Sequence, residues 1–216
     1  GHNDESHNHN DVGSFIACLD CSPLIIDVGP EYYTAKTFSA QRYEIWTMRS
    51  TWHNVPLING HEQAPGRAFA AGDVQYQADA TSASLALDLA AAYPADTGIK
   101  SWQRNITLHR GEALSITDNY ALSAATNPNE YHYVTNRSVD ISRPGRVRLG
   151  KSPSAETGRG AELTYDATAL EAHVTTMDVT DSRLIDVWGK QIHSIDLVEK
   201  TTPLTATRTI RISPAK

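Results

Sequence analysis

The sequence predicts an all-β protein, a large antiparallel β-sandwich with few or no helices. Short runs that alternate apolar and polar residues recur along the chain, and most are bounded by Gly, Pro, Asn or Asp. A period of two places the apolar side chains on one face of a strand, as in a half-buried sheet. The 216 residues suffice for one domain with a large core, so residues 1–216 are expected to form a single domain.

The first expected hairpin joins two short apolar runs, residues 14–19 and 23–27, across a turn at 20–22. It carries the two cysteines of the chain, Cys18 and Cys21, which are too few for a disulfide framework. We expect them to be half-buried hairpin residues. A local disulfide and a pair of metal ligands stay open as alternatives.

A clearer hairpin follows, in which residues 105–110 and 113–118 alternate around a turn at Arg110-Gly111-Glu112. Residues 204–212 alternate in the same way near the C-terminus. Shorter runs rich in β-branched and aromatic residues predict further strands. These runs cover residues 131–136, 146–149, 162–166 and 173–179.

Three segments lack an unambiguous strand pattern. Residues 80–93 are alanine-rich, but their leucines have even spacing, which favours a strand over a short helix. Residues 34–52 are aromatic without a clean period, so we expect a long ordered loop or a short helix, a kind of segment that is often functional. Residues 150–160, rich in Ser, Pro and Gly, are expected to form a surface loop.

The charge distribution argues against a nucleic-acid binder, because the formal net charge is -6 and no basic block occurs. No segment approaches the roughly 20 apolar residues of a membrane helix. The first residues show neither a basic start nor an apolar run, so no signal peptide is visible.

Three histidines, His2, His7 and His9, fall within the first nine residues. Such a cluster could be a purification remnant or a frayed terminus. Tags are repetitive, however, whereas this stretch mixes Asn, Asp, Glu and Ser and leads into an expected strand. In an extended chain His7 and His9 project to the same side, so they could share a site.

Three blocks in the first third of the chain resemble the C-terminal region of heparinase II/III-type polysaccharide lyases, in their order and spacing. The first is Glu5-Ser-His-Asn-His-Asn-Asp-Val-Gly-Ser-Phe, and the second is Leu24-Ile-Ile-Asp-Val-Gly followed by Tyr33-Thr34. The third is Ser50-Thr-Trp-His-Asn-Val, followed by Ile58-Asn-Gly and Gln63. From Ala64 onward the resemblance is limited to the strand pattern.

The resemblance implies a structural zinc ion bound by His9, Asp27 and His53. Two imidazoles and a carboxylate are suitable zinc ligands, and another protein group or water can take the fourth position. Asn10 and Asp11 could orient an imidazole through its second ring nitrogen, or they could cap the turn into the next strand.

The resemblance also implies β-elimination, in which the C5 proton of a uronic acid is removed and the C4 oxygen is expelled. Such a step needs a base, an acid and a group that neutralises the carboxylate. His7 matches the catalytic histidine of the family. Tyr33 is expected to be the catalytic tyrosine, with Tyr32 and Tyr43 as rivals that spacing does not exclude.

Four residues of the aromatic segment could line a sugar site by stacking and charge pairing, although a role in the fold is the favoured interpretation for each. They are Arg42, Trp46, Arg49 and Trp52.

Complete enzymes of the family place the active site between an N-terminal α/α-toroid and this sandwich. The expected partners are thus an acidic polysaccharide and a toroid domain of the same protein, and the fragment alone is expected to be inactive. The family implies a periplasmic or secreted location. The alternatives are a non-catalytic carbohydrate-binding sandwich, with Trp46 and Trp102 stacking on sugars, and an inert scaffold. The clustered histidines favour the lyase, since a binding module has no need of them.

Overall fold

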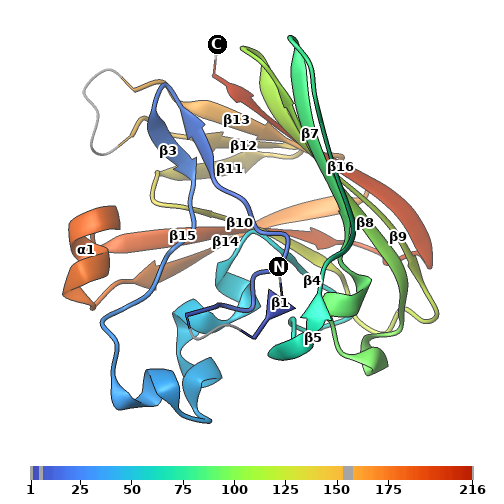
Figure 1. Cartoon of the computed structure of the whole chain (residues 1–216). Coiled ribbons are helices and arrows are strands. Elements are labelled where there is room, and N and C mark those ends of the chain that lie inside the picture. Colours follow the sequence, from blue (N-terminus) through green and yellow to red (C-terminus); the bar gives the residue numbers. More distant parts are fainter. Residues whose placement is uncertain (1, 5–6, 153–157, 216) are drawn as a thin grey trace.

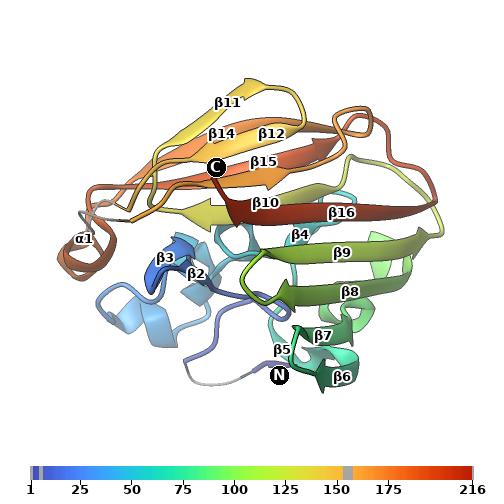
Figure 2. The ribbon, with the colours of Figure 1, turned by 90° about the horizontal axis from the view of Figure 1, so that it is seen from above.

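Two antiparallel sheets pack face to face in the computed structural model, which describes residues 2–4, 7–152 and 158–215 (Figures 1 and 2). This confirms the predicted all-β sandwich. The core lies between the sheets, where Trp102 stacks on Tyr120 with ring centroids 4.7 Å apart and lies 6.0 Å from the ring of Tyr131. Burial of such large aromatic side chains contributes most of the free energy that holds two sheets together.

The larger sheet has eight strands in the order β11-β12-β13-β16-β9-β8-β7-β6. Its long central hairpin turns at residues 110–112, as the alternation predicted. The predicted strand within residues 80–93 is also confirmed, as β7. The strands are β6 (Gly72–Ala78), β7 (Ser82–Asp88), β8 (Ile99–His109), β9 (Ala113–Leu122), β11 (Val139–Arg143), β12 (Arg146–Leu149), β13 (Ala161–Thr164) and β16 (Thr205–Pro214).

The smaller sheet has four strands in the order β14-β15-β10-β4. They are β4 (Pro56–Leu57), β10 (Glu130–Thr135), β14 (Leu170–Asp178) and β15 (Gln191–Glu199). One α-helix, α1 (Ser182–Trp188), connects β14 to β15, and the carboxylate of Asp181 caps it by accepting the N–H of Leu184. Its buried Leu184 packs beside Ile192 of β15 in a second apolar cluster on the outer side of this sheet.

Two small ribbons complete the sheets: β1 (His2–Asn3) pairs with β5 (Gly66–Ala70), and β2 (Ala17–Leu19) with β3 (Ser22–Ile25). The β2–β3 turn is made by Asp20 and Cys21, both with positive φ, as two-residue hairpin turns require. Cys18 and Cys21 are free and exposed, so the expected half-burial and the alternative of a local disulfide are both wrong. Cys21 lies in the turn, and Cys18 points to solvent from β2.

Residues 34–52 form neither one helix nor a plain loop but four consecutive 3₁₀ turns, η1 (Ala35–Phe38), η2 (Arg42–Glu44), η3 (Trp46–Met48) and η4 (Ser50–Trp52). Two further turns, η5 (Ala90–Ala92) and η6 (Ala95–Thr97), connect β7 to β8. The turns η1 to η4 lie next to the N-terminal residues at one end of the sandwich (Figure 1). The predicted loop at 150–160 lies partly outside the described residues.

Asn54 connects the end of the sandwich that contains the N-terminal residues and η1 to η4 with the strands. Its side-chain amide donates to the carbonyls of Phe15 and Ile26 at 2.7 and 2.9 Å, and its side-chain oxygen accepts the N–H of Val134 at 2.8 Å. These bonds join three segments that are distant in sequence and satisfy buried backbone groups. The residue next to His53 is therefore fixed against the four-stranded sheet and the segments that flank the β2–β3 ribbon.

Candidate functional site

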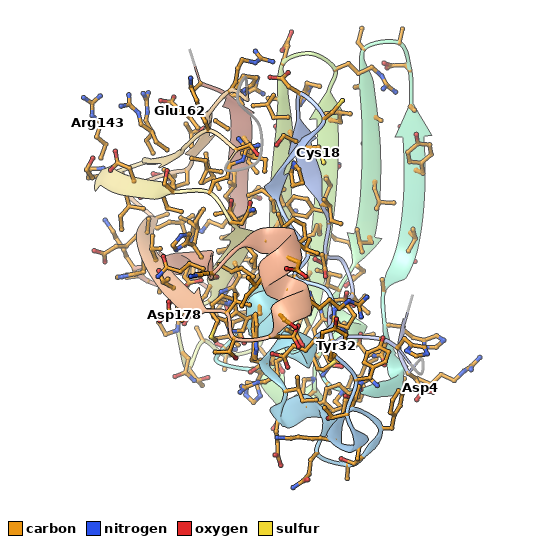
Figure 3. The ribbon with its side chains drawn as sticks, turned by 90° about the vertical axis from the view of Figure 1, so that its left-hand side faces the viewer. Asp4, Cys18, Tyr32, Arg143, Glu162 and Asp178 are labelled. Atoms are coloured by element: carbon orange, nitrogen blue, oxygen red, sulfur yellow. The ribbon has the colours of Figure 1, made fainter. Side chains whose placement is uncertain are left out.

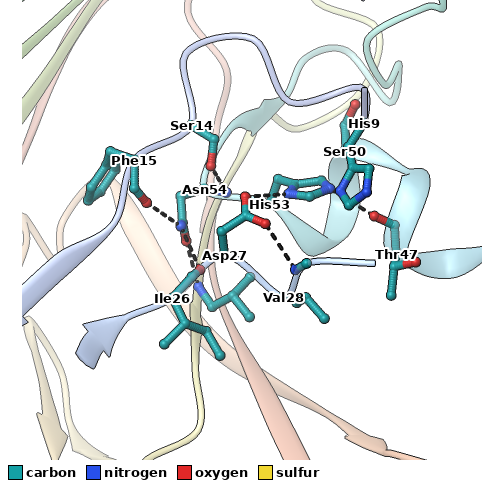
Figure 4. A network of polar contacts seen from close by, with 12 residues as sticks. His9, Ser14, Phe15, Ile26, Asp27, Val28, Thr47, Ser50, His53 and Asn54 are labelled. Carbon is teal, nitrogen blue, oxygen red and sulfur yellow. Dashed lines mark hydrogen bonds and ion pairs between the residues drawn. The ribbon is translucent and has the colours of Figure 1, made fainter. Parts of the chain in front are cut away.

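The structure brings His9, Asp27 and His53 together at this end of the sandwich. His9 belongs to the N-terminal segment, Asp27 follows β3, and His53 follows η4. One side-chain donor atom of each residue lies within 4.8 Å of the others (Figure 4). The sandwich fold thus gathers three residues that span 45 positions of sequence into one cluster able to hold a metal ion.

The hydrogen bonds of His53 define which ring nitrogen can act as a ligand. Nε2 lies 3.0 Å from the carbonyl oxygen of Thr47, which only accepts, so Nε2 carries a proton. Nδ1 lies 3.0 Å from Oδ2 of Asp27. Two ligands about 2.0–2.1 Å from a tetrahedral zinc ion are roughly 3.3 Å apart, so Nδ1 and Oδ2 have near the separation that such an ion requires.

The Asp27 carboxylate is oriented by the backbone two residues later. Its Oδ1 accepts the N–H of Gly29 at 3.0 Å, and this leaves Oδ2 facing His53. Burial raises the pKa of Asp27, but the hydrogen bond and charge of His53 outweigh burial, and the net pKa is lowered. Burial likewise lowers the pKa of His53, and the hydrogen bond and charge of Asp27 reverse this to a net raised pKa. Without a metal the pair shares a proton, and a cation would replace that proton.

His9 supplies the third donor. Its ring is 8% exposed, and its centroid lies 5.0 Å from that of His53. Burial, and next the nearby charge of His53, lower the pKa of His9 to about 4, so the imidazole is neutral near pH 7. A neutral imidazole has the free lone pair that a metal ligand needs. The donor set therefore fits a divalent cation such as zinc.

A surface hollow of about 400 Å³ opens beside this cluster, and His7, His9, Asp11 and Asp27 are among the residues that line it. Burial raises the pKa of Asp11, and the His53 charge opposes this only in part. Asn10 donates to the backbone carbonyl of Gln63, 3.2 Å away, rather than to an imidazole. The carbonyl of Thr47 orients His53 instead, and a backbone group leaves no side-chain signal in the sequence.

His7 and Tyr33 meet at the rim of the hollow. The Nδ1 atom of His7 lies 3.0 Å from the Tyr33 hydroxyl, and the two rings stack with centroids 5.3 Å apart. Phe38 packs edge-on against both rings, a contact that the sequence did not predict. Both His7 and Tyr33 are exposed, so a solute can reach the hydroxyl.

Among the described residues, neither of the rival tyrosines contacts His7. Tyr32 is 61% exposed, and its backbone N–H donates to the carboxylate of Asp181. Tyr43 is half-buried within η2. The geometry therefore favours Tyr33 as the tyrosine paired with His7.

The two arginines predicted to bind substrate have different surroundings. Arg42 is buried, and its guanidinium donates to the carbonyls of Thr37 and Asn8. Since Asn8 lies between His7 and His9, Arg42 holds the backbone that carries both histidines. Arg49 is exposed, and its guanidinium is paired with the carboxylate of Glu62.

The tryptophans also differ. Trp52 is buried and packs edge-on against Trp46, with centroids 5.1 Å apart. Trp46 is half-buried, donates to the Glu31 carboxylate at 2.8 Å, and lines a second hollow next to Tyr32. Trp102 is fully buried in the core, so its proposed stacking on a sugar ring in a binding module is wrong.

The fold resembles that of solved heparan sulfate lyases. The heparan sulfate lyase HepC from Pedobacter heparinus aligns over 96% of this chain with a TM-score of 0.70 and 13% identity. The heparinase III BT4657 gene product aligns over 96% with a TM-score of 0.71 and 16% identity. A third structure, described as heparinase III, aligns over 98% with a TM-score of 0.67 and 15% identity.

This likeness is one of fold, since identity is low. The chain spans 31% of the length of each of these three proteins. No family model matches the sequence, and no curated protein matches it. Within the described residues, no helix is long and apolar enough to cross a membrane.

Proposed function

We propose that this chain is the β-sandwich domain of a polysaccharide lyase that cleaves uronic-acid-containing polysaccharides by β-elimination. The observation that carries the proposal is the 3.0 Å contact between His7 Nδ1 and the Tyr33 hydroxyl, at the rim of a hollow beside three metal-type ligands. The fold likeness to heparan sulfate lyases over 96% of the chain supports it.

The reaction needs groups that move a proton at the sugar ring. A base takes the C5 proton, the C5–H electrons form the C4=C5 double bond, the C4–O bond breaks, and the leaving oxygen gains a proton. In this proposal the Tyr33 oxygen takes the C5 proton and passes it to the leaving C4 oxygen, so the protons balance, and His7 positions that oxygen through Nδ1. The second ring nitrogen of His7 can donate a hydrogen bond to the substrate carboxylate, where negative charge builds up.

We assign a structural zinc ion to His9, Asp27 and His53. Bound there, zinc would link the three segments that carry these residues and need not touch the substrate. The backbone that follows His7 would then be held at His9 by the metal site and at Asn8 by Arg42. Trp46 and Arg49 remain proposed substrate contacts. Arg42 and Trp52 are buried, so their proposed role is to stabilise the fold around the site.

The remaining active-site groups belong, in this proposal, to an N-terminal α/α-toroid of the same protein. The length of the matched lyases, of which this chain spans 31%, supports a larger protein. Residues 1–216 are then one domain of that protein, which we place in the periplasm or outside the cell. The chain alone should bind an acidic polysaccharide weakly and should not cleave it.

The test compares the chain alone with the chain joined to the rest of its protein, using heparan sulfate and alginate oligosaccharides as substrates. Ultraviolet absorbance of the unsaturated product reports turnover. We expect only the complete protein to turn over substrate. Its turnover should fall about 10²- to 10⁴-fold in Tyr33→Phe and should be unchanged in Tyr32→Phe. Clear turnover by the isolated chain, or full activity of Tyr33→Phe, would refute the proposal.

A further inference from the structure

Four arginines gather at the opposite end of the eight-stranded sheet from the candidate site. They are Arg143, Arg146, Arg148 and Arg211, called here the arginine patch, and they come from β11, β12 and β16. Figure 3 shows Arg143 and Glu162 at the upper left of the molecule, far from Tyr32 and Asp4 in its lower part. None of these arginines belongs to the site described above.

The strand register places these side chains on one face. Arg143 is the direct cross-strand partner of Arg146, and Arg146 is the partner of Thr164. Thr164 in turn pairs with Arg211. Because cross-strand partners project to the same side of a sheet, these arginines share one face, and Arg148, two residues beyond Arg146, shares it as well.

Four guanidinium groups share this face with three carboxylates, those of Glu162, Glu112 and Asp140, the last of which is the direct cross-strand partner of Arg148. Glu162 accepts from both Arg146 and Arg148, at 3.1 and 3.2 Å, so one carboxylate serves two arginines. Arg211 lies 3.9 Å from Glu112, and among the described residues Arg143 forms no ion pair. Like charges directly opposite each other destabilise a sheet. An anion bound between them would relieve this repulsion.

The chemistry of the patch indicates the kind of anion. Arginine forks bind sulfate and carboxylate groups through two parallel hydrogen bonds, and the Thr164 hydroxyl on the same face can bond a sugar hydroxyl. The residues of the patch include no aromatic ring on which nucleic-acid bases could stack. The arginines lie on the adjacent strands β11 and β12 and on β16, which β13 separates from β12, so the strands that bear them are about 5 to 10 Å apart. Such a row of cationic side chains suits a linear polymer with repeated anionic groups.

We propose that the arginine patch is a second, non-catalytic binding surface for a sulfated or carboxylated polysaccharide. The choice of a polysaccharide among polyanions rests on the proposed lyase function, whereas anion binding itself rests on the arginines alone. A polymer held there stays tethered to the enzyme between cleavage events at the distant candidate site.

Isothermal titration of the chain with a size-defined heparin oligosaccharide tests the patch. The double variant Arg146→Gln/Arg148→Gln should bind the oligosaccharide at least about tenfold more weakly, because two charge-assisted contacts are lost. The charge-matched control Arg67→Gln/Arg183→Gln removes two exposed arginines elsewhere and should bind like the original chain. Equal affinity of the patch variant and the original chain would overturn the proposal.

A substitution that is expected to strengthen binding shows that weaker binding of the double variant is not simply a result of misfolding. Glu162→Gln removes the carboxylate that competes for two arginines, so it should tighten heparin binding severalfold. Weaker binding of Glu162→Gln would contradict the proposal. This titration measures binding to the chain without any turnover, so its outcome does not depend on whether the candidate site cleaves the polymer. If duplex DNA of equal charge binds as tightly as heparin and shows the same variant effects, the assignment to a polysaccharide is wrong.

Discussion

The Nδ1 atom of His53 faces Oδ2 of Asp27 at 3.0 Å, while its Nε2 is held by the carbonyl of Thr47. This arrangement allows two occupants of the space between imidazole and carboxylate: a shared proton, or a cation that His9 also binds. The second occupant links the N-terminal segment to the end of β3 and to η4. The stability of this end of the sandwich should therefore depend on metal.

Chelation is predicted to lower the melting temperature. A ligand present at about 100 times its Kd stabilises the folded state by about 2.7 kcal/mol, and 1 kcal/mol corresponds to about 2–4 °C for a chain of this size. Removing zinc should thus lower Tm by about 5–10 °C in a thermal scan, with recovery when zinc is restored. An unchanged melting curve after complete metal removal would exclude a structural role.

Asn54→Ala is predicted to destabilise the chain by about 2–4 kcal/mol, because it leaves the buried groups of Phe15, Ile26 and Val134 without their partners. Denaturant unfolding measures this loss. Asn105→Ala, at an exposed position on β8, is the matched control and should change stability by less than about 0.5 kcal/mol. Equal effects of the two substitutions would show that Asn54 does not anchor the site.

Asp196 of β15 is predicted to make the free energy of unfolding depend on pH in the acid range. Burial raises its pKa, but hydrogen bonds from His132, Ser194 and Thr175, with the His132 charge, outweigh burial and give a net lowered pKa. A lowered folded-state pKa stabilises the protein above the unfolded value of about 3.9, and this contribution is lost as pH falls through the folded value.

The difference in unfolding free energy between the original chain and Asp196→Asn should therefore be largest near neutrality and shrink between about pH 5 and pH 3. Urea unfolding at several pH values measures it. Asp178→Asn, at the exposed end of β14, serves as the control. A difference that stays constant over this range would show that the Asp196 carboxylate is not stabilised by its neighbours.

Alternation of apolar and polar residues predicted the strands that have one solvent-facing side, such as β8, β9 and β16. It failed for β15, which is buried over most of its length because the core covers one face and the His132–Asp196 network and the second apolar cluster cover the other. The sequence of β15 accordingly shows no clean period of two. The strand β6 was missed although Val74, Tyr76 and Ala78 alternate with polar residues, and as an edge strand it is exposed at every residue.

The helix α1, the one α-helix among the described residues, was missed for a different reason. Within α1, Leu184 is the one buried residue, and seven residues give too few turns for a helical period to be recognised. Its capping residue, Asp181, was present in the sequence but was not interpreted as a cap.

For the candidate site, the sequence blocks indicated His7, His9, Asp27, Tyr33 and His53, and the structure places them at one end of the sandwich. What the sequence could not give was the role of backbone groups, such as the Thr47 carbonyl, and the burial of Arg42. Both depend on how the four 3₁₀ turns fold against the N-terminal segment.

The central claim is that His9, Asp27 and His53 form a zinc site that holds His7 and Tyr33 in place. Elemental analysis of protein prepared without a histidine tag tests it most directly. We predict about one zinc ion per chain, lost in His53→Ala and retained in His61→Ala, which alters a half-buried histidine outside the cluster. A chain that binds no zinc after equilibration with the metal, or a His53→Ala variant that keeps it, would contradict the claim.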